Sequence, residues 1–388
     1  MTMGIDRRRF LGAGAGLAAG LVLPARALGQ ALPAVVGAAE GALFAAACKD
    51  AQGQFAAVIF DADTGRDVAR VALPARGHDI AQRPDSQRPD SDGVRGMREV
   101  VAFARRPGNF AVVFGPDPAR QPLWFTSRAD RYFYGHGVFS GDGRLLYTTE
   151  NDFEAGVGTI GVRDATAGYK QIGELGSGGI GPHDLALLAD GQTLVVANGG
   201  IKTHPDTPRL ELNLATMQPS LAYIDTRTGD LLERHELPAA LHQLSIRHLA
   251  VGANATVLFG CQFNGPGWQT QNIVGRHRRG QPIELLALPD DVTLAMRNYV
   301  ASLCVDPTGE TAVIAAPRGG LAVVVDVRSG RYLARHAMPN VFGVAARRDG
   351  SGFLMSSGNG QLAALTGEPL PQTQALARAW DNHLVALS

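Results

Sequence analysis

Five of the ten histidines in this 388-residue sequence share one position in a repeated pattern. Each stands at the start of a short apolar segment, and the residue two positions after it is always apolar. The five are His78, His136, His183, His248 and His383. Symmetry-related segments in a closed ring would bring these imidazoles together on one axis. We therefore predict a metal site formed by these five side chains.

The residue types indicate which metals to expect. Neutral imidazole is a good ligand for copper, iron, zinc and nickel, whereas magnesium and calcium prefer oxygen ligands. The pattern contains no clear carboxylate or thiolate ligand, so the expected cofactor is a transition-metal ion, first iron or copper and then zinc. Two more copies of the pattern have Ser302 and Gly343 at the histidine position. One sector of the ring would then be open to water or substrate, as a catalytic or redox metal requires.

Polar residues near the ring positions are candidates for supporting roles. Asp79 and Asp184 each follow a ring histidine and could accept a hydrogen bond from an imidazole. On a regular strand, however, neighbouring side chains point to opposite sides, which would turn both carboxylates away from the ring. Possible channel-face residues are Glu150, Asn198, Arg247, Ser302 and Arg318. Of these, Arg247 could line the entrance together with Phe342 and Asn382, and Arg318 could hold an anionic ligand.

The rest of the sequence predicts how these residues are positioned. Short runs of valine, isoleucine, leucine and alanine, separated by Asp-Gly, Thr-Gly and Ser-Gly turns, favour many short antiparallel strands. Similar units begin at residues 78, 136, 183, 248, 302, 343 and 383, and a second hairpin in each unit brings it to four strands. Seven such units, spaced by roughly 40 to 65 residues, are typical of the blades of a β-propeller.

The last unit needs strands from the other end of the chain. No strand follows the segment at His383, but three strand-like segments lie at 43–48, 55–65 and 70–73. We therefore predict an all-β, seven-bladed propeller over residues 31–388, whose last blade is closed by N-terminal strands plus the C-terminal strand. This closure leaves no free sheet edge.

Residues 1–27 have the features of an export signal. Three arginines at 7–9 precede an apolar stretch from Leu11 to Leu23, and Ala25-Arg26-Ala27 has the small-x-small pattern of a cleavage site. The twin arginine before Phe-Leu indicates the Tat route, which exports folded proteins. We expect a periplasmic protein, monomeric and without a membrane anchor in its mature form.

Composition and missing motifs exclude several function classes. The 36 basic residues balance the 36 acidic ones, which gives no electrostatic case for binding nucleic acid. The three cysteines, Cys48, Cys261 and Cys304, lie in apolar runs and are expected to be buried thiols. No nucleophile elbow, phosphate-binding loop, haem-attachment motif or His-Glu-x-x-His helix is present.

Several phrases of the sequence resemble a bacterial family. They occur at residues 134–140, 147–152, 181–185, 197–201, 212–214 and 219–221. Together with the leader they look like those of Tat-exported, seven-bladed propellers of unknown function, often encoded beside imelysin-like iron-regulated proteins and a dihaem oxidoreductase. The resemblance covers nearly the whole mature chain. It implies a periplasmic role in iron or copper acquisition, with iron-uptake or redox proteins as partners, and it assigns no catalytic residue.

Three functions follow from these observations. The first is a periplasmic transition-metal-binding propeller that acts in iron or copper uptake or in redox handling. The second is a metal-dependent enzyme of the propeller lactonase or oxidoreductase type, in which the metal activates water in the open sector. The third is a metal-free scaffold that docks partner proteins on its loop face.

Overall fold

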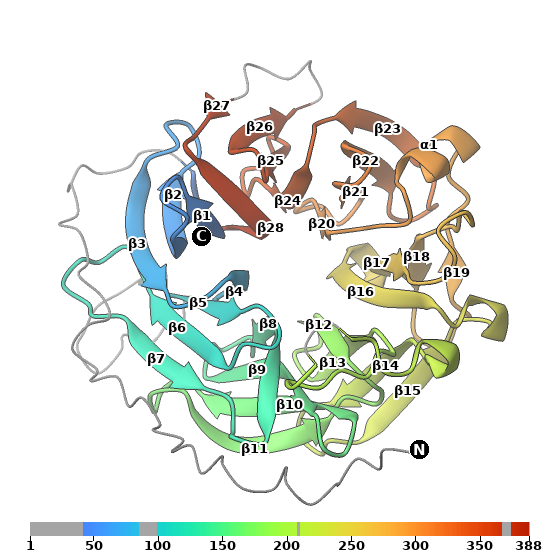
Figure 1. The fold of residues 1–388 in the computed structure, drawn as a ribbon, viewed down its shortest axis with the longest axis horizontal. Helices are drawn as coiled ribbons and strands as arrows, with labels where there is room; N and C mark the ends of the chain where they lie inside the picture. Colours follow the sequence, from blue (N-terminus) through green and yellow to red (C-terminus); the bar gives the residue numbers. More distant parts are fainter. Residues whose placement is uncertain (1–41, 85–98, 208–209, 367–373, 388) are drawn as a thin grey trace, which may run out of the picture. The chain divides into compact units, whose positions relative to one another are not determined.

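The computed structural model describes residues 42–84, 99–207, 210–366 and 374–387. These belong to one structural unit, Ala31–Ser388, while the other unit, Met1–Gln30, contains the predicted export signal and lies outside the described residues. In the described part, 28 strands form seven four-stranded antiparallel sheets. The sheets stand in a ring around a central axis (Figure 1). The predicted all-β, seven-bladed propeller is confirmed.

Six blades each use four consecutive strands. Their innermost strands, next to the axis, are β4 (Gly77–Gln82), β8 (Arg131–Phe139), β12 (Pro182–Leu187), β16 (Leu244–Val251), β20 (Ser302–Val305) and β24 (Val341–Ala346). The second strands are β5 (Val100–Ala104), β9 (Leu145–Asp152), β13 (Thr193–Asn198), β17 (Val257–Phe263), β21 (Thr311–Ala316) and β25 (Phe353–Ser357). The third strands are β6 (Phe110–Phe114), β10 (Val157–Asp164), β14 (Ser220–Asp225), β18 (Val274–His277), β22 (Leu321–Asp326) and β26 (Gln361–Leu365). The outermost strands are β7 (Leu123–Thr126), β11 (Lys170–Gly176), β15 (Leu231–Glu236), β19 (Glu284–Leu285), β23 (Tyr332–Ala337) and β27 (Gln374–Ala375).

The seventh blade joins distant parts of the chain. Its strands, from the axis outwards, are β28 (Arg378–Ala386), β1 (Leu43–Asp50), β2 (Phe55–Asp61) and β3 (Asp67–Leu73). The pairing of β28 with β1 is antiparallel and places Phe44 opposite Ala386 and Asp50 opposite Arg378. The predicted closure by three N-terminal strands and one C-terminal strand is therefore confirmed.

Tight turns link the first and second strands in several blades, among them β8 to β9 and β12 to β13. Gly143 and Gly191 occupy the same place in two of these turns, with φ of +67° and +68°. Glycine adopts this left-handed conformation without the steric cost that a Cβ atom brings. The side chain of Asp190 accepts hydrogen bonds from the backbone N–H groups of Gln192 and Thr193, at 2.9 and 2.8 Å. The Asp-Gly pairs at these turns thus fix where β9 and β13 begin.

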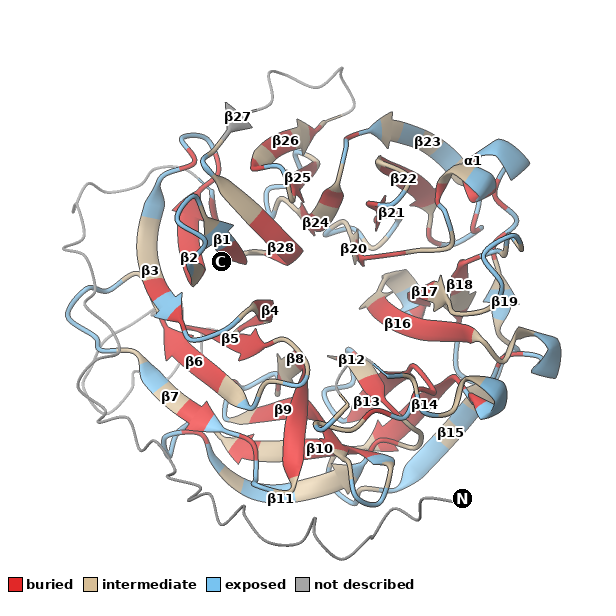
Figure 2. Cartoon of the chain, viewed as in Figure 1, coloured by how far each residue is buried: buried red, intermediate tan, exposed pale blue. Residues whose placement is uncertain are grey.

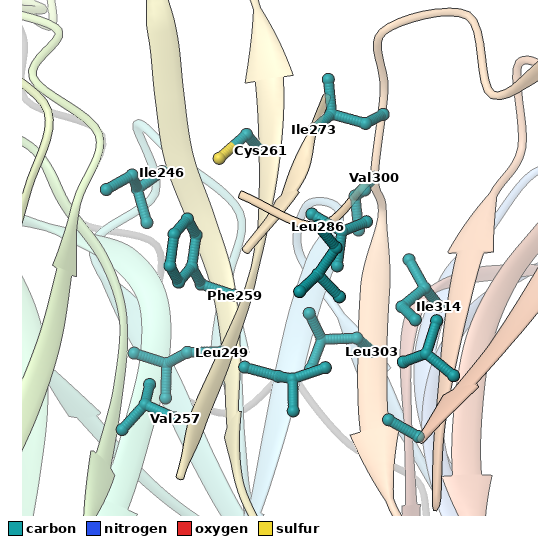
Figure 3. Close-up of a cluster of buried hydrophobic side chains, with 14 of the residues drawn as sticks. Ile246, Leu249, Val257, Phe259, Cys261, Ile273, Leu286, Val300, Leu303 and Ile314 are labelled. Atoms are coloured by element: carbon teal, nitrogen blue, oxygen red, sulfur yellow. The ribbon is translucent and has the colours of Figure 1, made fainter. Parts of the chain in front are cut away.

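Apolar side chains fill the space between neighbouring blades. Figure 3 shows one such cluster, which includes Phe259 and Cys261 of β17 and Leu303 of β20 in the next blade. Burial is greatest on the inner strands, whereas the outermost strands β11, β15 and β23 alternate exposed and partly buried residues (Figure 2). Cys48 and Cys261 are buried free thiols, as predicted, and Cys304 is partly exposed.

Helices contribute little to the fold. Among the described residues, helix is limited to α1 (Asp290–Ala295) and three short 3-10 turns at Leu214–Thr216, Ala239–Leu241 and Ala253–Ala255. Within the described ranges, no helix has the length and apolar character needed to cross a membrane.

The closing strand can be tested by shortening one of its side chains. Trp380 of β28 is 3% exposed, and its ring lies 4.7 Å from that of Phe60 on β2. We expect Trp380→Ala to lower the free energy of unfolding by about 3–5 kcal/mol, because it leaves a cavity in the seventh blade. The matched control is Trp268→Ala, since Trp268 is 81% exposed and its loss should cost less than about 0.5 kcal/mol. If chemical denaturation showed that both variants lower the free energy of unfolding equally, β28 would not close the ring as described.

Candidate metal centre

The structure brings the five predicted histidines together at the axis. Each comes from a different innermost strand: β4, β8, β12, β16 and β28. Among the neighbouring pairs, the ring centroids of His136 and His383 are 4.6 Å apart and those of His136 and His248 are 5.7 Å apart. Four of the five residues are buried and His183 is nearly so. The imidazoles therefore form one cluster, here called the histidine ring.

β-Bulges turn extra residues of the innermost strands towards the axis. The register between β4 and β5 shifts between Gly77 and Ile80, and that between β12 and β13 shifts between Pro182 and Asp184. A bulge sets two residues opposite one and so interrupts the alternation of side chains. As a result, Asp79 and Asp184 face the ring together with the histidines before them. The expectation that regular alternation would turn both carboxylates away is wrong for this reason.

The bulge in β8 is larger and places His136 among its neighbours. Its register shifts between Phe133 and Gly137, and Thr149 on β9 satisfies the displaced backbone. The Thr149 hydroxyl accepts a hydrogen bond from the His136 N–H at 3.3 Å and donates one to the His136 carbonyl at 3.2 Å. Gly135 has φ of +107°, and a Cβ atom on it would lie 2.6 Å from Cδ2 of His78. Only glycine therefore lets these two strands approach so closely.

His136 lies between two carboxylates. Its Nδ1 is 3.2 Å from Oδ2 of Asp79 and 3.3 Å from Oδ1 of Asp184. Asp184 is itself fixed by the N–H of Leu249 in the next blade, which donates to Oδ2 at 3.0 Å. Burial opposes a charge on His136, but the carboxylates of Asp184 and Asp79 outweigh it and raise the pKa to about 10. The Nδ1–H of His136 is thus held as a donor to both aspartates.

The other four ring histidines are neutral at pH 7. Burial, together with the nearby imidazoles and arginines, holds the pKa of His78, His183 and His248 well below its usual value. Burial also lowers the pKa of His383 to about 4, although Asp79 partly opposes this shift. Neutral imidazoles keep a lone pair that a metal ion can use.

Ring nitrogens of all five histidines are buried without a hydrogen-bond partner in the described part of the chain. They are Nδ1 of His78, Nε2 of His136, Nε2 of His183, both nitrogens of His248 and Nε2 of His383. Leaving buried polar atoms without a partner costs free energy, and native proteins rarely do so. Metal coordination would satisfy these atoms, so the donor set fits a transition-metal ion.

Two groups of three ligand atoms are close enough to hold an ion. One consists of His78, His136 and His383, and the other of His136, His183 and His248, with ligand atoms within 4.8 Å of one another in each group. Both groups use His136, which has a single free nitrogen. The ring could therefore hold one ion through either group, or through ligands drawn from both.

A pocket reaches the ring in the sector that lacks histidines. It has a volume of about 500 Å³, and its lining includes Asp79, His136, Asp184, Ser302 and His383. Ser302 of β20 is buried, and its hydroxyl donates to the carbonyl of Phe342 at 2.5 Å. The sector opposite the imidazoles is thus open to a small molecule.

Two of the predicted channel-face residues differ in their contact with the histidine ring. Arg247 is buried, with Nη1 3.5 Å from Nδ1 of His183. Burial and the positive charge of Arg106 lower the pKa of Arg247 to about 10. Arg318 is exposed and lies over the ring of Tyr299, 4.3 Å from its centroid, and not against the imidazoles.

Two others point into the blades. The carboxylate of Glu150 accepts hydrogen bonds from Arg163 at 3.0 Å and Thr148 at 2.7 Å. The side chain of Asn198 exchanges hydrogen bonds with Ser177. Both side chains are fully buried, and their hydrogen-bond partners lie within the blades and not at the axis, so placing them on the channel face is wrong.

Comparisons with known proteins agree with the fold. A family model described as "Protein of unknown function (DUF1513)" matches residues 71–387. No curated protein matches the chain. Among solved structures, the hydrazine synthase of Kuenenia stuttgartiensis is 16% identical, covers 79% of this chain and 90% of its own, and has a TM-score of 0.56. In all, 1153 solved chains match, so the fold by itself selects no function.

The carboxylates can be tested as the cause of the raised pKa. In the double variant Asp79→Asn/Asp184→Asn, we expect the pKa of His136 to fall from about 10 to below its usual value, because burial then acts unopposed. NMR titration of labelled imidazoles in metal-free protein measures this shift. The pKa of His136 in each single variant should lie between the values in the wild type and the double variant. A pKa that stays near 10 in the double variant would show that the two aspartates do not raise it.

Proposed function

The chain belongs to the DUF1513 family of proteins of unknown function, and we propose that its histidine ring binds one transition-metal ion. One observation carries the proposal: buried nitrogens of five histidines converge and have no hydrogen-bond partner in the described residues. Imidazole ligands favour iron, copper or zinc over magnesium or calcium.

The proposed role is iron or copper uptake, or redox handling of these metals, in the periplasm. The export signal expected at residues 1–27 and the resemblance to Tat-exported propellers support this location. Periplasmic iron-uptake or redox proteins would be the partners.

The residues around the ring have distinct tasks in this proposal. Asp79 and Asp184 hold Nδ1–H of His136, so that Nε2 of the same ring is turned to the ion; carboxylates beside metal-binding histidines commonly act in this way. The four neutral imidazoles supply lone pairs without first losing a proton. His136, which is charged at pH 7, would release its Nε2 proton to solvent on binding the ion and keep Nδ1–H bonded to the aspartates. A bound transition metal would supply Lewis acidity or one-electron chemistry. The sector at Ser302 and Gly343 leaves room for a further ligand.

Metal stoichiometry and single-histidine variants test the proposal. We expect elemental analysis to find one ion per chain. We also expect the electron paramagnetic resonance spectrum of the copper-loaded protein to show hyperfine structure from the imidazole nitrogens. His136→Ala removes a ligand from both groups and should abolish tight binding. His383→Ala disrupts the group with His78, and His183→Ala disrupts the group with His248. The variant with the larger loss of metal affinity identifies the group that binds the ion.

The controls separate ligand loss from unfolding. His336→Ala, on the outermost strand β23, should bind metal like the wild type. Because His136→Ala leaves two carboxylates without their partner, circular dichroism must show that each variant is folded. Less than one ion per chain, unchanged in folded His136→Ala and His183→Ala, would leave only the metal-free scaffold.

The supporting carboxylates give a graded test. Asp79→Asn/Asp184→Asn should weaken metal binding by about 10- to 100-fold, the usual effect of removing groups that orient metal ligands. Competition with a chromophoric chelator measures this change. Unaltered affinity would show that the two aspartates do not support the ion.

The pocket favours a second candidate function, metal-dependent catalysis. It adjoins His136 and His383 on the side where Ser302 and Gly343 supply no imidazole, so water or substrate could reach an ion there. Turnover of lactones, or of a redox substrate, that requires metal and is lost in His383→Ala would support it. Metal binding without turnover of either substrate would favour uptake.

A further inference from the structure

Four arginines gather at one end of the central channel. Arg76 directly precedes β4, Arg105 and Arg106 follow β5, and Arg247 precedes His248 within β16. In an antiparallel blade, the innermost strand begins on the face where the second strand ends. All four residues therefore lie towards the face where the innermost strands begin.

These arginines are close enough to influence one another. The N–H of Arg105 donates to the carbonyl of Arg76 at 2.9 Å. The positive charges of Arg76 and Arg106 act on Arg105, and that of Arg106 acts on Arg247. Arg105 and Arg247 also act on the imidazole of His248, which links the cluster to the histidine ring.

Carboxylates near the cluster are too few to balance its charge. Asp381 binds Arg76 through two hydrogen bonds, at 2.5 and 3.0 Å. Within the described residues, Arg105, Arg106 and Arg247 form no ion pair with any carboxylate. Glu211 influences Arg247 but makes no direct contact with it. Three guanidinium groups at this end of the channel thus have no ion-pair partner among the described residues.

Two of these guanidinium groups also have unsatisfied donors. Nη1 of Arg106 and Nε of Arg247 are buried and have no hydrogen-bond partner in the described part of the chain. Arg247 is only 7% exposed, so its side chain is built into the site and is not a surface residue that happens to be nearby. A guanidinium group matches the two oxygens of a carboxylate, or those of a phosphate, through parallel N–H donors. The missing partner is therefore an oxyanion.

We propose that Arg105, Arg106 and Arg247 bind a small polycarboxylate anion beside the histidine ring, at the end of the channel where the innermost strands begin. Nη1 of Arg247 lies 3.5 Å from Nδ1 of His183, so a carboxylate held by this arginine lies next to the ring. This inference rests on the proposed metal site and names its substrate class: an anionic carboxylate chelate of the metal. The arginines neutralise the chelator while the imidazoles receive the ion.

Anion binding to metal-free protein tests this site separately from the metal. The chelator-treated protein is titrated with citrate, with tricarballylate and with inorganic phosphate by calorimetry. Citrate and tricarballylate carry the same three carboxylates, but only citrate has the hydroxyl that strengthens chelation. We expect both to bind, and to bind more tightly than phosphate.

Variants locate the bound anion. Arg105→Gln/Arg106→Gln should weaken citrate binding by at least about tenfold, because it removes two charge-assisted hydrogen-bonding groups. Arg66→Gln, an exposed arginine in the turn between β2 and β3, should bind citrate like the wild type. Copper binding in the absence of citrate should not be weakened in the double variant.

The outcomes distinguish the two proposals. If no carboxylate binds the metal-free protein, or phosphate alone binds, the proposed polycarboxylate site is wrong. The metal titrations of the histidine variants would still decide whether the histidine ring binds a metal ion. Citrate binding that is equal in the double variant and the wild type overturns the assignment to these arginines. Citrate binding without any metal binding would keep the anion site and refute the metal-binding function.

Discussion

Pairing of β28 with β1 closes the ring of blades, and everything at the axis depends on this closure. The innermost strands can hold five imidazoles with centroids 4.6–5.7 Å apart only if all seven blades stand in register around one axis. Apolar clusters between the blades supply most of the driving force for this arrangement. The polar centre is therefore stabilised by the packing around it.

The β-bulges determine which side chains of the innermost strands face the central channel. A regular innermost strand would offer one side chain in two to the channel, and the aspartates beside His78 and His183 would face the blades. The bulges at these positions direct a histidine and a carboxylate to the same side. Bulges often occur next to functional sites because they redirect side chains in this way. In this protein they place two carboxylates around one imidazole.

Much of this structure follows from local patterns in the sequence. Turns such as those at Gly143 and Gly191, before β9 and β13, mark the repeat in the sequence, so the blade number and the histidine position could both be predicted. The bulges could not, because they depend on contacts such as that of Thr149 with His136 across two strands. Glu150 and Asn198 were misplaced because a loop position in sequence can be a buried strand end in space. The gathering of the arginines involves two blades that are far apart in the sequence, so it has no local signal.

The position of β28 in the chain has a consequence for assembly. Its partner β1 lies more than 300 residues earlier, so this contact forms only after all the intervening blades have been synthesised. Contacts between residues so distant in sequence form slowly, and until then the edge of β1 is open to pairing with another molecule. The same strand delivers His383. A nascent chain therefore acquires its fifth imidazole and loses its aggregation-prone edge in one step, which ties a complete histidine ring to a finished fold.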